Sequence, residues 1–367
     1  MNGGLYMSNV YVKTKHRSYY IHIEERDWKP FIIYLKESLK SNRLLIVCDD
    51  NVHKLYYQSI DIMLSEAKFD HDVVVVPHGE ATKSIKWAEK LYTKAIDNRL
   101  DRQSTIVALG GGVVGDLSGF IAATYMRGIG FVQVPTTLLA QIDSSVGGKV
   151  AINHLMAKNI VGSFYQPSMV YINISTLETL SEREFLSGLA ELIKYGFIWD
   201  YEFLNWMDDN IDKILARDIE ALKNAIAKAC KIKAHIVSID ETEQGIRAIL
   251  NFGHTIGHAI EAATNYKIYT HGEAIAIGMI YETKLAYNLG LINRQYLDNM
   301  IFLFKRCSLP TDLKDVDTSL LMDKMSLDKK NKGGDIVFVL PVDAGEVEIF
   351  SNIDKDILEK TLAKGCE

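Results

Sequence analysis

Residues 105–116 read TIVALGGGVVGD, and this stretch decides the fold of the first half of the chain. Residues 105–109 form a compact apolar run of strand length, and the glycines that follow have the spacing G-x-G-x-x-G: Gly110, Gly112 and Gly115. Glycines at a strand-to-helix turn let backbone N–H groups approach a pyrophosphate at the helix N-terminus. The stretch therefore predicts a dinucleotide-binding turn, with tight packing as the alternative explanation.

The downstream sequence argues against an ordinary first-strand dinucleotide site. Such a site has an acidic residue about 20 positions after the glycines, but there is no Asp or Glu between Asp116 and Asp143. Asp49, two residues before Asn51, follows another apolar run at 44–48 and could contact a ribose in its place. We therefore expect the site to be assembled from several strand ends.

Further apolar runs of strand length surround this stretch, at residues 44–48, 73–76, 131–134 and 169–172. Residues 52–67 and 84–98 carry apolar side chains at helical spacing between these runs. Alternating strands and helices are typical of a parallel sheet buried on both faces, and such sheets bind ligands at the carboxyl ends of their strands. We predict an α/β domain over residues 1–178.

The second half of the chain has a helical period instead. From residue 181 to about 290 apolar residues recur at helical spacing, as at Ile219, Leu222 and Ile226. Residues 336–340 and 346–350 flank a turn at 341–345 and predict a small hairpin. We predict a helical second domain over residues 179–367, so that the fold class is α/β plus all-α.

Charge and cysteine content exclude several classes of function. With 41 Lys+Arg against 47 Asp+Glu, the formal net charge of -6 gives no general attraction to nucleic acid or to an anionic membrane. An anionic ligand would need a local cluster of cations. The cysteines are widely separated and form no CxxC pair, which favours a reducing, cytoplasmic setting: Cys48, Cys230, Cys307 and Cys366.

Neither export nor membrane insertion is expected from the sequence. Residues 1–20 lack the apolar core of a signal peptide. The most apolar region, residues 117–142, is interrupted by Arg127 and Pro135 and falls short of the roughly 20 apolar residues that span a bilayer. We read this region as buried protein core.

Residues 143–149, DSSVGGK, resemble a phosphate-binding loop, but the Walker pattern requires glycine where Asp143 stands. ATP-driven chemistry is therefore disfavoured. Lys149, Lys158 and Arg127 instead lie within one glycine-rich stretch, as an anionic small-molecule substrate would require. The alternative is that these cations are solvated surface charges.

A histidine pattern in the second half indicates a metal site. Residues 251–258, NFGHTIGH, place His254 and His258 on one helical face, and His271 follows after a turn-forming stretch. Thr255 occupies the position of the general-base glutamate of zinc peptidases, so peptide hydrolysis is not supported. Isolated histidines are often core or surface residues, but their closeness here favours a metal ion.

A carboxylate ligand could complete this site. Glu191 lies on an apolar helical stretch, where an unpaired carboxylate would be costly. Lys194 follows one turn later on the same helical face.

Taken together and in order, these motifs closely resemble those of the 3-dehydroquinate synthase family. The matching runs are residues 110–116, 125–128, 135–137, 143–149, 158–159, 188–194, 251–258 and 271–273. The resemblance extends from about residue 49 to residue 330, and the joint occurrence and order of the motifs are specific. It implies an NAD-binding α/β domain, a helical metal domain, an active site between them and a homodimer.

The resemblance also implies roles for individual residues. One divalent ion, Zn²⁺ or Co²⁺, would be bound by Glu191, His254 and His271, and His258 would contact substrate instead of the metal. NAD contacts would come from Asp49, Asn51, Glu80, Lys83, Gly111, Gly112, Val113, Asp116, Thr136, Thr137, Lys149, Lys158 and Thr179. Contacts to the substrate would come from Arg127, Asp143, Lys149, Lys158, Asn159, Lys194, Lys233, Arg247, Asn251, His258 and either Lys329 or Lys330. Asp143 could touch substrate or orient Lys149.

The reaction implied by the resemblance converts 3-deoxy-D-arabino-heptulosonate 7-phosphate to 3-dehydroquinate and phosphate, in the shikimate pathway to chorismate and the aromatic amino acids. Transient oxidation by NAD, phosphate elimination, reduction and an intramolecular aldol step would follow one another. A carboxylate and a phosphate on the substrate match the local cations. A sister sugar-phosphate cyclase would share nearly all these residues, and an NAD- and metal-dependent polyol dehydrogenase would share the domains without needing so many cations. A non-enzymatic scaffold would leave the metal cluster without a purpose.

Overall fold

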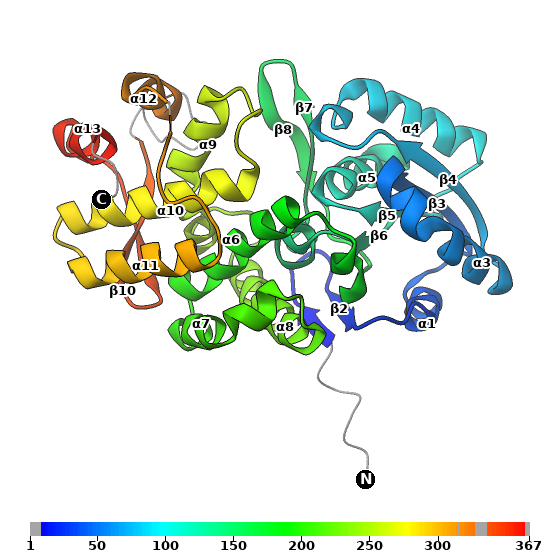
Figure 1. Ribbon diagram of the computed structural model, residues 1–367. Coiled ribbons are helices and arrows are strands. Elements are labelled where there is room, and N and C mark those ends of the chain that lie inside the picture. Colours follow the sequence, from blue (N-terminus) through cyan, green and yellow to red (C-terminus); the bar gives the residue numbers. More distant parts are fainter. Residues whose placement is uncertain (1–8, 315, 327–335, 364–367) are drawn as a thin grey trace, which may run out of the picture. The chain divides into compact units, whose positions relative to one another are not determined.

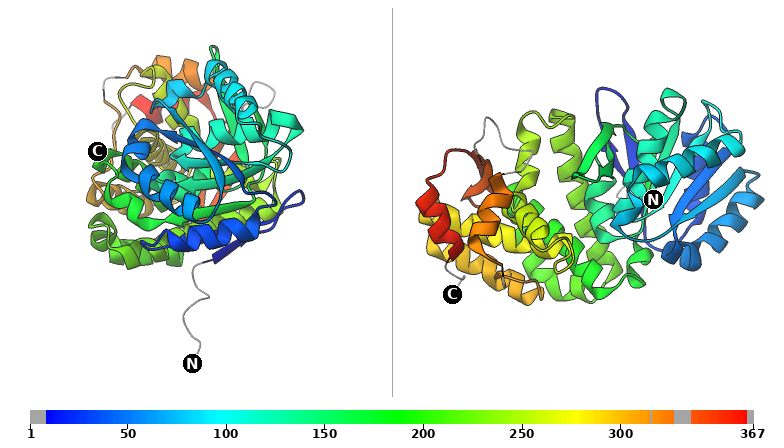
Figure 2. Two further views of the ribbon diagram at one scale, coloured as in Figure 1. Left: turned by 90° about the vertical axis from the view of Figure 1, so that its right-hand side faces the viewer. Right: turned by 90° about the horizontal axis from the view of Figure 1, so that it is seen from above.

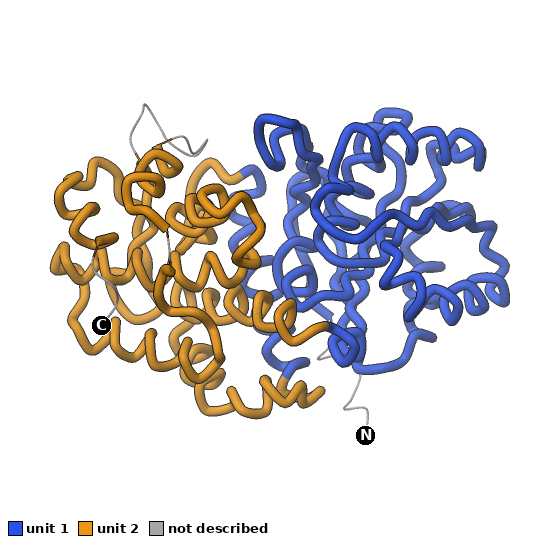
Figure 3. Tube along the Cα trace, turned by 45° about the horizontal axis from the view of Figure 1, so that its top comes forward, with its two compact units in different colours: residues 1–180, 222–242 blue, residues 181–221, 243–367 orange. Residues whose placement is uncertain are grey.

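The computed structural model describes residues 9–314, 316–326 and 336–363. The chain forms two compact units, shown in different colours in Figure 3. The first contains residues 1–180 and 222–242, and the second contains residues 181–221 and 243–367. Residues 222–242, most of which belong to helix α8 (Ile219–Ile239), thus return to the unit formed by the N-terminal half.

A seven-stranded sheet forms the centre of the first unit in the described chain, in the order β1-β2-β9-β6-β5-β3-β4 (Figure 1). Its strands are β1 (Asn9–Val12), β2 (Tyr19–Glu24), β3 (Arg43–Asp49), β4 (Asp70–Val76), β5 (Thr105–Gly110), β6 (Gly130–Pro135) and β9 (Met169–Asn173). Only β1 and β2 pair in antiparallel fashion, and the other neighbours are parallel. The five predicted apolar runs are confirmed as β3, β4, β5, β6 and β9.

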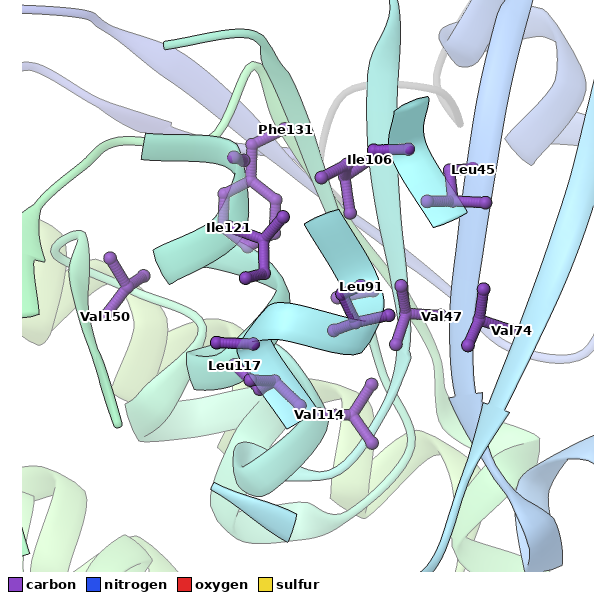
Figure 4. Packing of buried hydrophobic residues seen from close by; sticks show 14 of the residues in the cluster. Leu45, Val47, Val74, Leu91, Ile106, Val114, Leu117, Ile121, Phe131 and Val150 are labelled. Atoms are coloured by element: carbon purple, nitrogen blue, oxygen red, sulfur yellow. The ribbon is translucent and has the colours of Figure 1, made fainter. Parts of the chain in front are cut away.

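Helices cover both faces of this sheet, as can be followed in Figure 2. These helices are α1 (Lys29–Ser38) and α3 (Gln58–Glu66) on one face, and α4 (Ile85–Asp97) and α5 (Gly112–Thr124) on the other. Within β3, Leu45 packs with Leu91 and Leu117 in one cluster (Figure 4), whereas Leu44 packs with Phe31 in the second. Alternate side chains of a strand point to opposite faces, so a continuous apolar run fills both cores.

Loops at the carboxyl ends of the strands carry short elements that the sequence did not predict. The π-helical turn η4 (Ala140–Ser144) follows β6, and a hairpin of β7 (Lys149–His154) and β8 (Ala157–Phe164) comes next. None of the positions of β8 is buried, so the apolar pattern of a core strand is absent there.

The second unit is largely helical. Its principal elements are α6 (Glu182–Ile198), α7 (Tyr201–Leu215), α9 (His254–Ala263), α10 (His271–Asn288), α11 (Arg294–Arg306), α12 (Thr318–Ser326), α13 (Lys355–Ala363), β10 (Phe338–Asp343) and β11 (Glu346–Phe350). The two strands form the expected hairpin, although Pro341 pairs with Val347 and shortens the turn. Among the helices of residues 9–314, 316–326 and 336–363, none has the length and apolar character needed to cross a membrane.

Candidate metal and cofactor sites

Three helices of the second unit bring one carboxylate and two imidazoles together. Glu191 lies on α6, while His254 and His271 are the first residues of α9 and α10. Glu191 Oε1 lies 3.3 Å from His254 Nε2 and 3.4 Å from His271 Nε2, and the side chain of Glu191 is 1% exposed. A group of one oxygen and two imidazole nitrogens within 4.8 Å of one another suits Zn²⁺ or Co²⁺.

Two further side chains adjoin this cluster. The ring of His258 lies 5.3 Å from that of His254, and Glu261 Oε2 lies 3.4 Å from His271 Nδ1. Burial lowers the pKa of His271, but Glu191 and Glu261 more than offset this and raise it to about 10. The carboxylates thus create a negative environment that favours a cation. Metal-binding histidines commonly donate their second N–H to such a carboxylate.

Glu261 was not among the predicted residues. It lies seven positions after His254 on α9, so the helical period puts it on the same face as His254 and His258. This spacing of seven residues could have predicted from the sequence that Glu261 lies beside the histidines.

The second unit also contains buried cations, and that of Lys194 lies against the metal cluster. The ammonium of Lys194, which is 1% exposed, contacts the Glu191 carboxylate and donates to the carbonyl of Leu250 at 2.8 Å. This confirms the predicted shared face of Glu191 and Lys194. Arg247, on the short helix η6 (Ile246–Asn251), is also 1% exposed. A charge in such surroundings needs an opposite charge or strong hydrogen bonds nearby.

Asn251 ends η6 and donates from Nδ2 to Glu243 Oε1 at 2.9 Å. The second unit therefore holds Glu191, Lys194, Arg247, Asn251, His254, His258 and His271 of the predicted site. Asp328, Lys329 and Lys330 lie outside the described residues.

In the first unit, the predicted cofactor residues follow the ends of three neighbouring strands. Asp49 ends β3, Lys83 follows β4, and Gly111 and Gly112 follow β5. Asp49 Oδ1 accepts hydrogen bonds from the amides of Asn51 and Val52 at 2.9 and 3.0 Å and so caps α2 (Asp50–Val52). Strands β5, β3 and β4 are adjacent in the sheet, so these loops meet at one edge.

The glycine turn fits closely against its neighbours. A Cβ on Gly111 would lie 3.1 Å from Thr137 Cγ2, and a Cβ on Gly112 would lie 3.1 Å from Ser144 Oγ. Helix α5 begins at Gly112, and the first N–H groups of a helix have no partner within it. Packing therefore explains why glycine is needed here, and the same helix start suits a pyrophosphate.

Lys83 links the loop after β4 to α5 and to the hairpin. This lysine is 4% exposed, and its Nζ donates to Asp116 Oδ2 at 2.6 Å and contacts Asn159 Oδ1. Burial lowers the pKa of Lys83, but Asp116 and Glu80 outweigh it and raise the pKa above its usual value. The network is completed by Asn153, whose Nδ2 donates to Glu80 Oε1 at 2.7 Å.

Residues at the remaining strand ends complete the first unit. Thr136 is buried and its amide donates to the carbonyl of Gly110 at 3.0 Å, while the hydroxyl of Thr179 contacts the hydroxyl of Tyr56. Val113 lies in the first turn of α5.

Among the predicted substrate residues of this unit, Lys233 on α8 is 5% exposed and donates from Nζ to Asp143 Oδ1 at 2.5 Å. Lys149 begins β7 on the surface, Lys158 is half-buried on β8, and Arg127 is exposed with a φ of 68°. Asp143 is thus held by Lys233, a pairing that the sequence did not reveal.

Comparison with known proteins matches most of the chain to one family. The model described as 3-dehydroquinate synthase N-terminal matches residues 73–187, and the model described as 3-dehydroquinate synthase C-terminal matches residues 188–331. A 3-dehydroquinate synthase from Caldanaerobacter subterraneus subsp. tengcongensis is 50% identical over 353 residues, which cover 96% of this chain and 99% of that protein. One from Shewanella frigidimarina is 43% identical over 361 residues, covering 97% of this chain and 99% of that protein.

Solved structures share the fold at lower identity. The 2-epi-5-epi-valiolone synthase of Streptomyces hygroscopicus subsp. jinggangensis, solved with NAD⁺ and Zn²⁺ bound, superposes with a TM-score of 0.87 at 24% identity, covering 96% of this chain and 97% of that one. A 2-deoxy-scyllo-inosose synthase complexed with carbaglucose-6-phosphate, NAD⁺ and Co²⁺ has a TM-score of 0.85 at 24% identity, with 96% and 99% covered.

Proposed function

Because the chain belongs to the 3-dehydroquinate synthase family, we propose that it converts 3-deoxy-D-arabino-heptulosonate 7-phosphate to 3-dehydroquinate and phosphate, as a carbon–oxygen lyase of the shikimate pathway. The structural observation that carries the proposal is the buried ammonium of Lys194 against the carboxylate of Glu191 in the metal cluster. An enzyme that acts on neutral polyols does not need a buried cation at this place, whereas an enzyme that binds an anionic sugar acid does.

The cofactors proposed are NAD and one divalent ion, Zn²⁺ or Co²⁺. Glu191, His254 and His271 would hold the ion, supported by their distances of 3.3 and 3.4 Å. When bound, the ion would supply Lewis acidity toward a substrate oxygen and NAD would supply a reversible hydride acceptor. NAD would be held by Asp49, Asn51, Glu80, Lys83, Gly111, Gly112, Val113, Asp116, Thr136, Thr137, Lys149, Lys158 and Thr179.

We assign recognition of the anionic substrate to the cations and amides around these sites. The proposed contacts are Arg127, Asp143, Lys149, Lys158, Asn159, Lys194, Lys233, Arg247, Asn251, His258 and one of Lys329 and Lys330. Fixed donors stabilise the charge that develops as phosphate leaves without needing to reorganise. Holding the phosphate close to the acidic C–H would let one of its own oxygens take the proton, and His258 would keep that oxygen in place.

The surroundings of the proposed cations indicate how each would act on the substrate. Lys194 and Arg247 are each 1% exposed, so in the absence of bulk water their charges would act strongly on a carboxylate or phosphate. The ammonium of Lys233 lies beside the carboxylate of Asp143. This carboxylate would offset part of the positive charge and fix the direction in which the ammonium points. These residues bind and orient the substrate, and no proton transfer is assigned to them.

A homodimer and a cytoplasmic location belong to the same proposal. Leu155 and Met156, at the tip of the β7–β8 hairpin, are 100% and 86% exposed and offer an apolar surface that a second copy would bury. Cys48, Cys230 and Cys307 are buried free thiols, which is the expected state of cysteines in a reducing compartment.

Phosphate release from 3-deoxy-D-arabino-heptulosonate 7-phosphate tests the proposed function. The purified protein is incubated with NAD and zinc while NADH absorbance is followed, and the product is identified by mass and NMR. We expect stoichiometric phosphate and 3-dehydroquinate without accumulation of NADH. Steady NADH formation with polyols and no phosphate would instead establish a dehydrogenase, and a cyclitol product from another sugar phosphate would establish a sister cyclase.

A further inference from the structure

Helix α10, which begins with His271, approaches the start of α9, which begins with His254, too closely for a side chain at Gly278 or Gly253. A Cβ on Gly278 would lie 2.0 Å from the carbonyl oxygen of Gly253. Gly253 itself has a φ of 80°, and a Cβ there would lie 2.4 Å from Met279 Cγ. Backbone therefore packs on backbone, and a shift of either helix start would move a metal-site histidine.

A fully buried carboxylate joins the two helices at this contact. Glu282 lies on α10, eleven residues after His271, and is 0% exposed. Its Oε2 accepts a hydrogen bond from the amide of Gly253 at 2.6 Å, and its Oε1 accepts one from the amide of Ile256 at 3.4 Å. These amides lie on either side of His254, so the carboxylate brackets that histidine along the backbone.

The choice of an acid at this position needs a reason beyond packing. Removing a carboxylate from water is costly, and an apolar side chain would fill the same space without that cost. The N–H groups at a helix start have no partner within the helix, and a negative charge is favourable there. The carboxylate of Glu282 therefore secures the start of α9 to the body of α10.

We propose that Glu282 is a positioning residue for the metal site, which holds the start of α9 so that His254 lies at ligand distance from Glu191 and His271. The proposal rests on the assignment of these three residues as metal ligands. Glu282 itself would not touch metal, NAD or substrate. Residues that orient metal ligands typically change metal affinity by 10–100-fold when they are altered.

The test is the affinity of the metal-free full-length protein for Zn²⁺, measured by competition with a chromogenic chelator. Glu282→Gln keeps the size of the side chain but replaces one acceptor oxygen with an NH₂ group, which cannot accept from the backbone amide it faces. We expect its Kd for zinc to rise about 10-fold or more. Its Kd for NAD, which binds to residues of the first unit, should stay unchanged.

Thr283→Val is the matched control. Thr283 is the next residue of α10, is also 0% exposed, and its hydroxyl lies 3.3 Å from Met300 Sδ. Removing this polar group disturbs the same helix at the same depth without reaching α9, so the zinc Kd should be unaltered even if the Tm falls. Equal zinc affinities for Glu282→Gln and Thr283→Val would overturn the proposal.

Glu282→Asp provides a second measurement on a milder change. It keeps the charge but withdraws the carboxylate by one methylene, and we expect a smaller rise in the zinc Kd than for Glu282→Gln. Should Glu282→Gln not fold, the aspartate variant decides by the same comparison with Thr283→Val. A Glu191→Gln protein that still binds zinc tightly would refute the ligand assignment itself, whereas loss there with unaltered affinity in Glu282→Gln would refute only the role of Glu282.

Discussion

The ammonium of Lys233 lies 2.5 Å from Asp143 Oδ1 and 2.6 Å from the carbonyl oxygen of Asp143. One side chain of α8 thus fixes both the carboxylate and the backbone of the turn that precedes Lys149. The pairing limits the directions in which Lys233 can present its charge.

Asp143→Ala should therefore reduce catalysis through Lys233. Without the carboxylate the position of the ammonium is less restricted, although the carbonyl oxygen of Asp143 still accepts from it. A misplacement of about 1 Å can cost on the order of 100-fold in rate. We expect kcat/KM for phosphate release to fall by about that factor, with a smaller loss in Asp143→Asn because the amide oxygen still accepts. Equal activity of the wild type and Asp143→Ala would show that the pairing has no part in turnover.

Glu191→Gln should abolish metal binding and turnover while the fold remains intact. The amide carries no charge to hold a cation between His254 and His271. Metal content after dialysis, phosphate release and circular dichroism measure the effect together. Glu184→Gln, at an exposed position of the first turn of α6, is the matched control and should retain metal. Activity that persists after complete metal depletion would contradict the assignment.

The sequence predicts those parts of the fold that depend on local pattern. The strand that ends at Gly110 and the helix that begins at Gly112 follow from an apolar run and a glycine turn, and both are present. In contrast, β8 was not predicted, because its exposed residues give no alternation against a core. The pairing of β7 with β8 stabilises that hairpin, together with the packing of Val150 and Ile152 of β7 into the core of the first unit.

Within the candidate site, too, contacts between residues that are distant in sequence could not be predicted from local pattern. Lys194 follows Glu191 by one helical turn, so their ion pair could be predicted from spacing. Lys233 and Asp143 are 90 residues apart, and Glu282 and Gly253 are 29 apart, so their contacts arise only when separate elements pack. The proposed metal ligands were predicted from the resemblance because each lies in a recognisable motif.

Asp49→Ala should weaken NAD binding. The variant removes the carboxylate proposed for the ribose and also the cap of α2, whose loss costs about 1 kcal/mol of stability. Isothermal titration with NAD measures the first effect and urea unfolding the second.

The control for this change is Asp101→Ala. Asp101 Oδ1 accepts from the amides of Gln103 and Ser104, each at 2.9 Å, in the loop before β5. That loop lies at the amino ends of the parallel strands, away from the proposed NAD residues. Loss of the Asp101 carboxylate should therefore reduce stability without changing NAD binding. If Asp49→Ala binds NAD as tightly as Asp101→Ala does, the ribose contact is wrong.

Lys83→Met should destabilise the first unit by leaving Asp116 without its cation. Burial raises the pKa of Asp116, and Lys83 lowers it only in part, so the net direction is upward. Breaking a buried ion pair by removing one partner costs about 3 kcal/mol or more. Urea unfolding in the absence of NAD should show this loss, and Lys83→Met combined with Asp116→Asn should recover most of it. A double variant no more stable than Lys83→Met would show that charge is not the cause.

His22 should make folding stability depend on pH. His22 is 8% exposed, and its ring stacks on that of Tyr34 with 3.7 Å between the ring centres. Its Nδ1 lies 3.0 Å from Asn9 Oδ1. Burial lowers the pKa of His22 from 6.5 to about 4. As the pH falls through this range, the unfolded chain binds a proton at this residue that the folded chain does not, so stability falls.

In His22→Gln that contribution is absent, because glutamine does not titrate. The free energy of unfolding of the wild type should therefore decrease more steeply than that of the variant between pH 6.5 and about 4, by at most about 3 kcal/mol. Urea unfolding at a series of pH values gives the difference between the two curves. Above pH 6.5 the difference between the two free energies of unfolding should be constant, since His22 is then neutral in both states. A difference that stays constant down to pH 4 would contradict the prediction, because the buried ring would then take up its proton as readily as an exposed one.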